Sequence, residues 1–322
     1  MIKVSIPDRP SIHDIRSRIT ALKRIDLRMA KIDVLKSRLK LLFRGFVFSS
    51  PVLMPGQVLY RGISWSEKPQ FRTQLSYPPC EAIKTLQRVN RQHKPMFYCS
   101  ASREAPIFEL GLKPGNYLAI SKWLVNQRIL VSNIGYSDEV FRKLGSARQA
   151  SPWWQFDLPQ TRLTANSLIA NFMASEFARV VNPGEEHLYK LPIAIAEKLY
   201  LDTLHPDPVD SKIDGMNQIG GIVYPSISMR ANSDNVALVP EFVDRFVSLE
   251  AVEWIRIDKE LHDFKFQVTN LDFANSFSSD GQIEWKGRRA NWFIGPGRQV
   301  CVSVEHGKYI VRDEQGNIIE PA

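Results

Sequence analysis

The sequence predicts an α+β protein with a mixed or antiparallel sheet core, a helical extension at the N-terminus and a β-rich region at the C-terminus. Three observations predict this class. First, short apolar runs bounded by turn residues occur in the middle of the chain. Second, segments with helical periodicity lie between some of these runs and make up most of the N-terminal region. Third, polar and apolar residues alternate between glycine turns from about Asp258 onward. The 322 residues therefore divide into a helical extension, 1–50, a central domain, 51–257, and a β-rich region, 258–322.

The first 50 residues predict an amphipathic helix or a pair of helices. Apolar side chains recur every three or four positions from Ile12 to Leu42, after a start at Pro10 and Ser11, and basic residues occupy the opposite face. Twelve Lys or Arg residues against four Asp residues in this segment equal the net charge of +8 of the whole chain. The apolar stripe is expected to pack on the central domain, to dock a partner or a second copy, or to lie on an anionic surface.

The central domain alternates predicted strands with predicted helices. Short apolar runs bounded by turns predict strands at 58–61, 96–99, 117–120, 128–132 and 221–224. Apolar residues at helical spacing predict helices at 166–181 and 191–201, where Pro192 falls in the first turn and is tolerated there. The chain is long enough for one large domain with appendages or for two domains, and in either case it can bury a substantial core.

Composition excludes several classes of protein. No apolar run approaches the roughly 20 residues of a membrane span, and the N-terminus lacks a signal-peptide pattern, so we expect a cytoplasmic protein with no transmembrane segment. Cys80, Cys99 and Cys301 are too few and too widely spaced for a disulfide framework or a zinc motif. The six histidines also lack metal-ligand spacing, and no metal site is expected.

An ordered set of polar residues marks the central domain as the candidate functional region. In chain order the set comprises Tyr60-Arg61, Arg88-Val-Asn90, Pro95, Tyr98, Glu109, Gly221-Ile-Val-Tyr-Pro-Ser226 and Asn235. Two arginines, a tyrosine, a glutamate and a serine are suited to an anionic sugar-phosphate ligand, because the planar guanidinium binds phosphate oxygens in a bidentate manner and stays charged.

This set, read in order over about residues 57–257, resembles the RES-domain family, which is named for its Arg, Glu and Ser. The characterised toxins of that family destroy NAD or use it for ADP-ribosyl transfer. The resemblance implies a core similar to the ADP-ribosyltransferase fold and an enzyme of a toxin–antitoxin system that cleaves the nicotinamide–ribose bond of NAD by phosphorolysis or hydrolysis. NAD is then the substrate, no further cofactor is required, and an antitoxin protein that covers the active site is implied, with a homo-oligomer also possible.

The resemblance also assigns roles to individual residues. Catalysis is assigned to Glu109, Arg61 and Ser226. Binding of NAD is assigned to Arg61, Arg88, Tyr98, Asn90, Asn235 and Tyr60. In this assignment the arginines hold the diphosphate, Glu109 stabilises the ribose or orients the attacking group, and Tyr98 stacks on a base. Ser226 is not expected to be a nucleophile, because no motif positions a histidine to activate it.

Each role has a structural alternative. If these residues have no functional role, the arginines form ordinary ion pairs and Glu109 is the exposed position of a helix. Tyr98 then belongs to the core, and Ser226 and Asn235 are turn residues.

One loop departs from the family pattern. Leu86-Gln87 and Arg91-Gln-His-Lys94 stand where family members carry glycines. If that loop needs a positive φ, His93 is among the non-glycine types that adopt it more readily. Arg91, His93 and Lys94 would then either strengthen phosphate binding or coat a solvated turn.

Two alternative functions are also compatible with the sequence. The first is an ADP-ribosyltransferase that modifies a protein target. The second is a protein without catalytic activity that binds nucleic acid or another partner through its basic N-terminal helix. The leading hypothesis includes no nucleic-acid partner.

Overall fold

The computed structural model describes residues 10–44, 46, 50–146, 148, 160–200, 218–261, 265–286, 299–305, 308–313 and 315–319. The α-helices of these residues are α1 (Ile12–Lys23), α2 (Ile32–Leu42), α3 (Ala105–Glu109), α4 (Asp138–Leu144), α5 (Gln160–Phe177), α6 (Lys190–Tyr200) and α7 (Pro240–Phe246). Three short 3-10 helices are η1 (Arg72–Leu75), η2 (Cys80–Ala82) and η3 (Glu186–Tyr189). Among these described residues, no helix is long and apolar enough to cross a membrane.

The strands of the described residues form one open sheet. They are β1 (Val52–Leu53), β2 (Val58–Ser64), β3 (Phe97–Ser100), β4 (Tyr117–Val125), β5 (Ile129–Asn133), β6 (Ile219–Pro225), β7 (Asp234–Leu238), β8 (Val247–Leu261), β9 (Lys265–Ala274), β10 (Gln299–Glu305) and β11 (Lys308–Arg312). Their order is β1-β5-β6-β7-β3-β2-β4-β8-β9-β10-β11. Only β5 and β6 pair in parallel in this described sheet, and the other neighbours are antiparallel. The predicted α+β class with a mixed, mostly antiparallel sheet is confirmed at this level.

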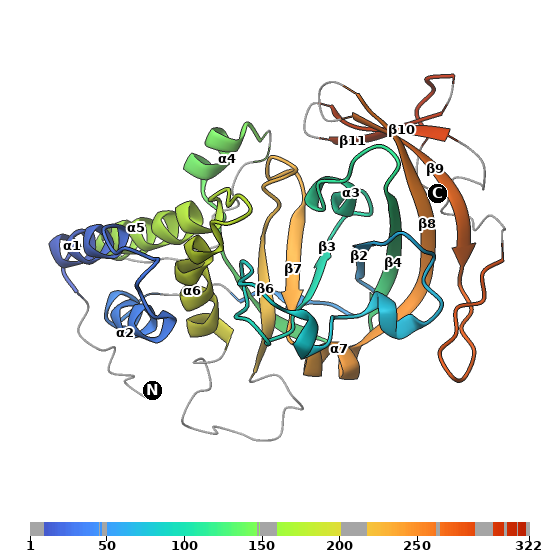
Figure 1. Cartoon of the computed structure of the whole chain (residues 1–322). Coiled ribbons are helices and arrows are strands. Elements are labelled where there is room, and N and C mark those ends of the chain that lie inside the picture. Colours follow the sequence, from blue (N-terminus) through green and yellow to red (C-terminus); the bar gives the residue numbers. More distant parts are fainter. Residues whose placement is uncertain are drawn as a thin grey trace.

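The C-terminal region continues the sheet of the central domain. The long strand β8 pairs with β4 on one side and with β9 on the other. β10 and β11 follow as further antiparallel neighbours and lie at the upper right of Figure 1. The expected boundary between 257 and 258 falls inside β8, whose pairing with β9 has an irregularity between Ile257 and Lys259 and continues on both sides of it.

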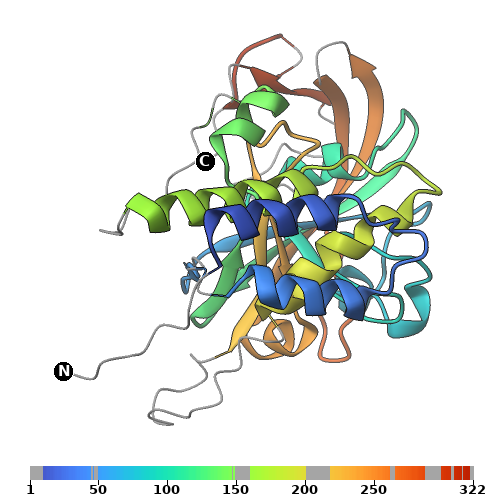
Figure 2. The ribbon, with the colours of Figure 1, turned by 90° about the vertical axis from the view of Figure 1, so that its left-hand side faces the viewer.

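The N-terminal segment is a helical pair whose apolar stripes are buried. α1 begins with a capping box, in which the Ser11 hydroxyl accepts from the Asp14 amide while the Asp14 carboxylate accepts from the Ser11 amide. α1 packs beside α5, and α2 beside α6, so that the four helices stand in front of the sheet in Figure 2. The packing alternative for this stripe is therefore the one observed.

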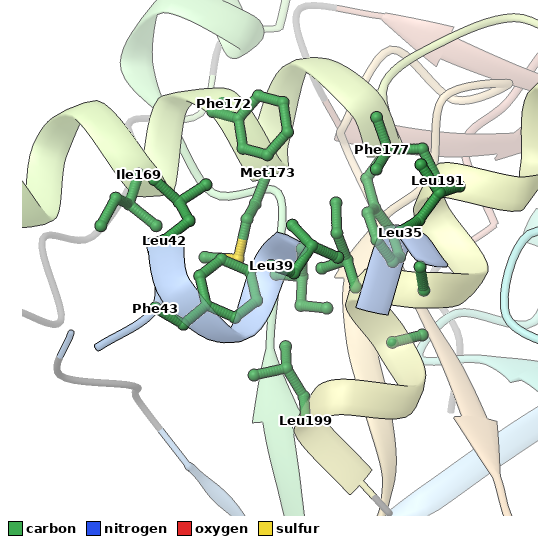
Figure 3. Close-up of a cluster of buried hydrophobic side chains, with 14 of the residues drawn as sticks. Leu35, Leu39, Leu42, Phe43, Ile169, Phe172, Met173, Phe177, Leu191 and Leu199 are labelled. Atoms are coloured by element: carbon green, nitrogen blue, oxygen red, sulfur yellow. The ribbon is translucent and has the colours of Figure 1, made fainter. Parts of the chain in front are cut away.

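The interior of this helical layer is a leucine-rich cluster. Leu35, Leu39 and Leu42 of α2 are fully buried in the cluster that also contains Phe172 and Met173 of α5 (Figure 3). Each such leucine contributes about 1.5–3 kcal/mol through removal of apolar surface from water. The same cluster reaches β6 and β7, so the helical extension and the central sheet share one core.

Candidate functional site

A cavity of about 350 Å³ lies where β2, β3, β7 and α3 meet. Of the residues singled out in the sequence, it is lined by Tyr60, Arg61, Arg88, Tyr98, Glu109 and Asn235. The antiparallel order β7-β3-β2 places segments that are far apart in the chain side by side (Figure 1). The two arginines and the glutamate therefore share one hollow.

Arg61 lies on β2, and its half-buried side chain is part of the cavity lining. Its Nη1 donates to the carbonyl oxygen of Tyr98 at 2.6 Å and its Nε donates to that of Ser76 at 3.2 Å. The guanidinium carbon lies 5.3 Å from the ring centroid of Phe97. Burial lowers the pKa of Arg61 to about 10, so the group is still protonated at neutral pH. Among the described residues it forms no ion pair with a carboxylate, and its positive charge is partly desolvated.

Arg88 is held by main-chain oxygens at the end of α5. Nη1 donates to the carbonyl oxygen of Phe177, and Nη1 and Nη2 both donate to that of Arg179 at 3.2 Å. The guanidinium carbon lies 5.4 Å from the ring centroid of Tyr189 in η3. Arg88 also forms no ion pair with a carboxylate of the described residues. The cavity thus contains two arginine side chains that form no ion pair with an acidic side chain of the described ranges.

Glu109 is the last residue of α3, and its carboxylate is held by three neutral donors. Oε1 accepts from the hydroxyl of Ser226 and from Nδ2 of Asn235, the latter at 2.8 Å. Oε2 accepts from the hydroxyl of Ser228 at 3.3 Å. These hydrogen bonds restrain the orientation of the carboxylate without neutralising it.

The hydroxyl of Ser226 is fully used for this restraint. It donates to Glu109 and accepts from the amide of Met229 at 3.2 Å, and the side chain is completely buried at the end of β6. Ser100 acts in the same way on Asn235, because its hydroxyl donates to Oδ1 at 2.7 Å and leaves Nδ2 directed at Glu109. Ser226 is therefore a positioning residue in this geometry, whereas Ser100 carried no signal in the sequence.

Tyr98 and Asn90 support the loop that carries Arg88. The Tyr98 hydroxyl donates to Oδ1 of Asn90 at 2.6 Å and accepts from the amide of Val89 at 3.1 Å. Burial raises the pKa of Tyr98 well above its ordinary value, so the hydroxyl stays protonated. Asn90 is buried and does not belong to the cavity lining, although the resemblance assigns it to NAD binding. Its observed contacts are those of a loop support.

The loop around residues 91–94, which departs from the RES-family pattern, forms with a positive φ at His93. His93 has a φ of +58°, the conformation that a glycine would otherwise supply. Arg91 turns away from the cavity and pairs with Glu197 of α6 at 2.5 Å and with Asp33 of α2 at 2.6 Å. Neither Arg91, His93 nor Lys94 lines the cavity. Arg91 instead forms ion pairs between the loop and the helices, and His93 and Lys94 are part of the turn.

Two aromatic residues of the lining were not assigned to the site from sequence. Tyr189 precedes α6 in a segment without a motif, and Tyr224 was noted only as part of a strand sequence. Burial raises the pKa of Tyr224, which keeps its hydroxyl protonated. The Tyr-Pro-Ser sequence after a predicted strand was a usable signal for Tyr224, whereas no local pattern marked Tyr189.

No protein-family model, curated protein or solved structure matches this chain. Within the described residues, no group of three or more His, Cys, Asp or Glu side chains is arranged to hold a metal ion. The described lining offers guanidinium, carboxylate and aromatic groups.

Gly62 permits the close approach of α3 that brings Glu109 over β2. A Cβ at this position would lie 2.3 Å from Cβ of Pro106 in α3, which is too close for either atom to remain in place. We expect Gly62→Ala to lower the free energy of unfolding by about 1–3 kcal/mol, as overpacking of a core does. Urea unfolding measures the loss.

A comparison with Gly62→Val separates this collision from a strand preference. Intrinsic β propensity favours valine over alanine, whereas the collision with Pro106 makes valine the worse residue. A valine variant as stable as the wild type would show that α3 does not need the space above Gly62.

Proposed function

We propose that this chain is an enzyme that cleaves the nicotinamide–ribose bond of NAD by phosphorolysis or hydrolysis, in the manner of the RES-domain toxins that it resembles. The observation that carries the proposal is the lining of one cavity by Arg61, Arg88 and Glu109. Two guanidinium groups without a carboxylate partner among the described residues match a diphosphate, and a restrained carboxylate matches a sugar that becomes positively charged. The cavity volume is in the range of small-molecule sites.

The chemistry requires charge separation within the cavity. Loss of nicotinamide develops positive charge on the ribose in an oxocarbenium-like transition state, which a nearby carboxylate stabilises. Glu109 supplies this carboxylate, and its hydrogen bonds to Ser226 and Asn235 remove the need to reorient it during the reaction. Arg61 and Arg88 hold the diphosphate, because guanidinium groups bind phosphate oxygens with charge-assisted hydrogen bonds.

The aromatic residues complete the proposed binding mode. Tyr98 uses its hydroxyl to hold the Arg88 loop, so its contribution to NAD is the ring face. Tyr189 lies beside Arg88 and offers a second ring in the same lining. The proposal includes a core of the ADP-ribosyltransferase type within the observed sheet, and an antitoxin protein that covers the cavity in the cytoplasm.

The test is incubation of the purified full chain with NAD, with and without inorganic phosphate, followed by chromatography of the products. We expect free nicotinamide, together with ADP-ribose in water or a phosphorylated ADP-ribose when phosphate is present. Mass spectrometry of added protein distinguishes the transferase alternative, because a modified target gains the mass of ADP-ribose while the free product does not accumulate. NAD that remains intact under all these conditions would rule the proposal out.

A further inference from the structure

A second cavity, of about 230 Å³, lies between the turn that joins α1 to α2 and the chain that joins α5 to η3. Leucine side chains form much of its wall, among them Leu22, Leu188 and Leu191. Its polar lining consists of Lys23, Asp26, Arg28, Arg179 and His187. This cavity is separate from the one that contains Glu109, and the proposed function does not use it.

The charges around the second cavity favour an anion. Lys23 and Arg28 are exposed, and their side chains form no hydrogen bond or close ion pair with another described residue, although Lys23 interacts electrostatically with the Glu176 carboxylate. Asp26, the acidic member of the lining, is partly satisfied locally because Oδ1 accepts from the amide of Arg28 at 2.9 Å. Arg179 forms an ion pair with the buried Glu176 at 2.6 Å. The three cations Lys23, Arg28 and Arg179 therefore outnumber the two carboxylates of Asp26 and Glu176, even with His187 counted as neutral.

Two short segments, 177–179 and 187–189, connect the linings of the two cavities, which have no residue in common. Arg179 presents its side chain to the second cavity, while its carbonyl oxygen accepts from Arg88 in the first. In η3, His187 lines the second cavity and Tyr189, two residues later, lines the first beside Arg88. A ligand that draws Arg179 or His187 toward itself therefore acts on the main-chain segment that holds Arg88.

We propose that the second cavity is a binding site for a phosphate-bearing anion and that its occupancy is coupled to Arg88 in the functional cavity. The phosphate oxygens accept hydrogen bonds from Lys23, Arg28 and Arg179, in charge-assisted contacts. Because such coupling is reciprocal, a ligand of the functional cavity changes the affinity of the second site by the same factor.

The test compares two double variants that lose the same net charge. Lys23→Gln with Arg28→Gln removes two cations of the lining, whereas Arg24→Gln with Lys31→Gln removes two exposed cations of the same α1–α2 connection that lie outside it. Inorganic pyrophosphate is titrated into each full chain by calorimetry at constant ionic strength. We expect the affinity of one class of sites to fall about tenfold or more in the first variant and to stay unchanged in the second.

Three outcomes would overturn the site. An equal loss of pyrophosphate affinity in both variants would show a long-range effect of net charge. An unchanged affinity in both variants would place the pyrophosphate elsewhere on the protein. No binding to the wild type would show that the second cavity is only a solvated basic patch. All cations replaced in these variants are exposed, so both variants are expected to fold. Their thermal unfolding is measured as the control for folding. The functional cavity retains Arg61 and Arg88 in every variant, so any binding there is common to all.

The coupling has its own measurement and rests on the proposed function, whereas the pyrophosphate titration does not. NAD affinity is measured with and without saturating pyrophosphate in both double variants. A pyrophosphate effect on NAD affinity that differs by about fivefold or more between them supports coupling, in the usual range of such free energies. An identical effect in both variants contradicts it and leaves competition at the first cavity as the explanation.

Discussion

Glu109→Gln is expected to slow NAD cleavage by about 10²- to 10⁴-fold without a change in the free energy of unfolding. A glutamine side-chain oxygen still accepts from the Ser226 hydroxyl and from Nδ2 of Asn235, so the geometry at the end of α3 is retained. In the proposed reaction, the substitution removes the negative charge that faces the developing positive charge on the ribose. The rate of nicotinamide release at saturating NAD measures the effect.

A matched control distinguishes local chemistry from net charge. Glu81→Gln removes one negative charge from an exposed residue of η2 that does not line the cavity, and we expect it to retain the wild-type rate. If Glu109→Gln also retained the wild-type rate, Glu109 would have no role in catalysis. The basic N-terminal helices would then be the better candidate for function, and binding with a steep salt dependence would be their signature.

Arg103→Met is expected to lower the free energy of unfolding by about 3–5 kcal/mol, because it leaves a buried carboxylate without its partner. Nε and Nη2 of Arg103 donate to the two carboxylate oxygens of Glu253, each at 2.6 Å. Glu253 lies on β8 and is completely buried, while Arg103 lies in the connection between β3 and α3. The pair thus ties the segment that precedes Glu109 to the neighbouring part of the sheet.

The pH dependence and a second substitution identify the buried charge as the cause. Burial raises the pKa of Glu253 to about 7 even though Arg103 opposes the shift, and loss of Arg103 raises it further. A carboxyl group with a raised folded-state pKa contributes stability at low pH that is lost as the pH rises through that pKa. The variant should therefore be less destabilised at about pH 5 than at about pH 8 in urea unfolding.

Adding Glu253→Leu should restore much of the stability, since replacing both partners by apolar residues removes the unpaired charge. A double variant as unstable as Arg103→Met at high pH would show that packing of the arginine stem, rather than the charge of Glu253, accounts for the loss.

The sequence by itself determined the local elements. Apolar periodicity predicted the strands near Tyr98 and Tyr224, the helices now seen as α5 and α6, and the apolar stripe that divides into α1 and α2. It also admitted a positive φ at His93, which the structure has. Local prediction succeeds here because an exposed or buried face repeats every two residues in a strand and about every 3.6 in a helix.

Only the tertiary structure decided how the polar residues meet. Arg61, Arg88 and Glu109 share a cavity because β2, β3 and β7 are neighbours in the sheet, although β7 follows β3 by more than a hundred residues. The packing of segments outside the strands made Asn90 a hydrogen-bond partner of Tyr98 and brought Tyr189 of η3 into the lining. Such contacts depend on strand order and on the packing of unpatterned segments, and neither leaves a periodic trace in the chain.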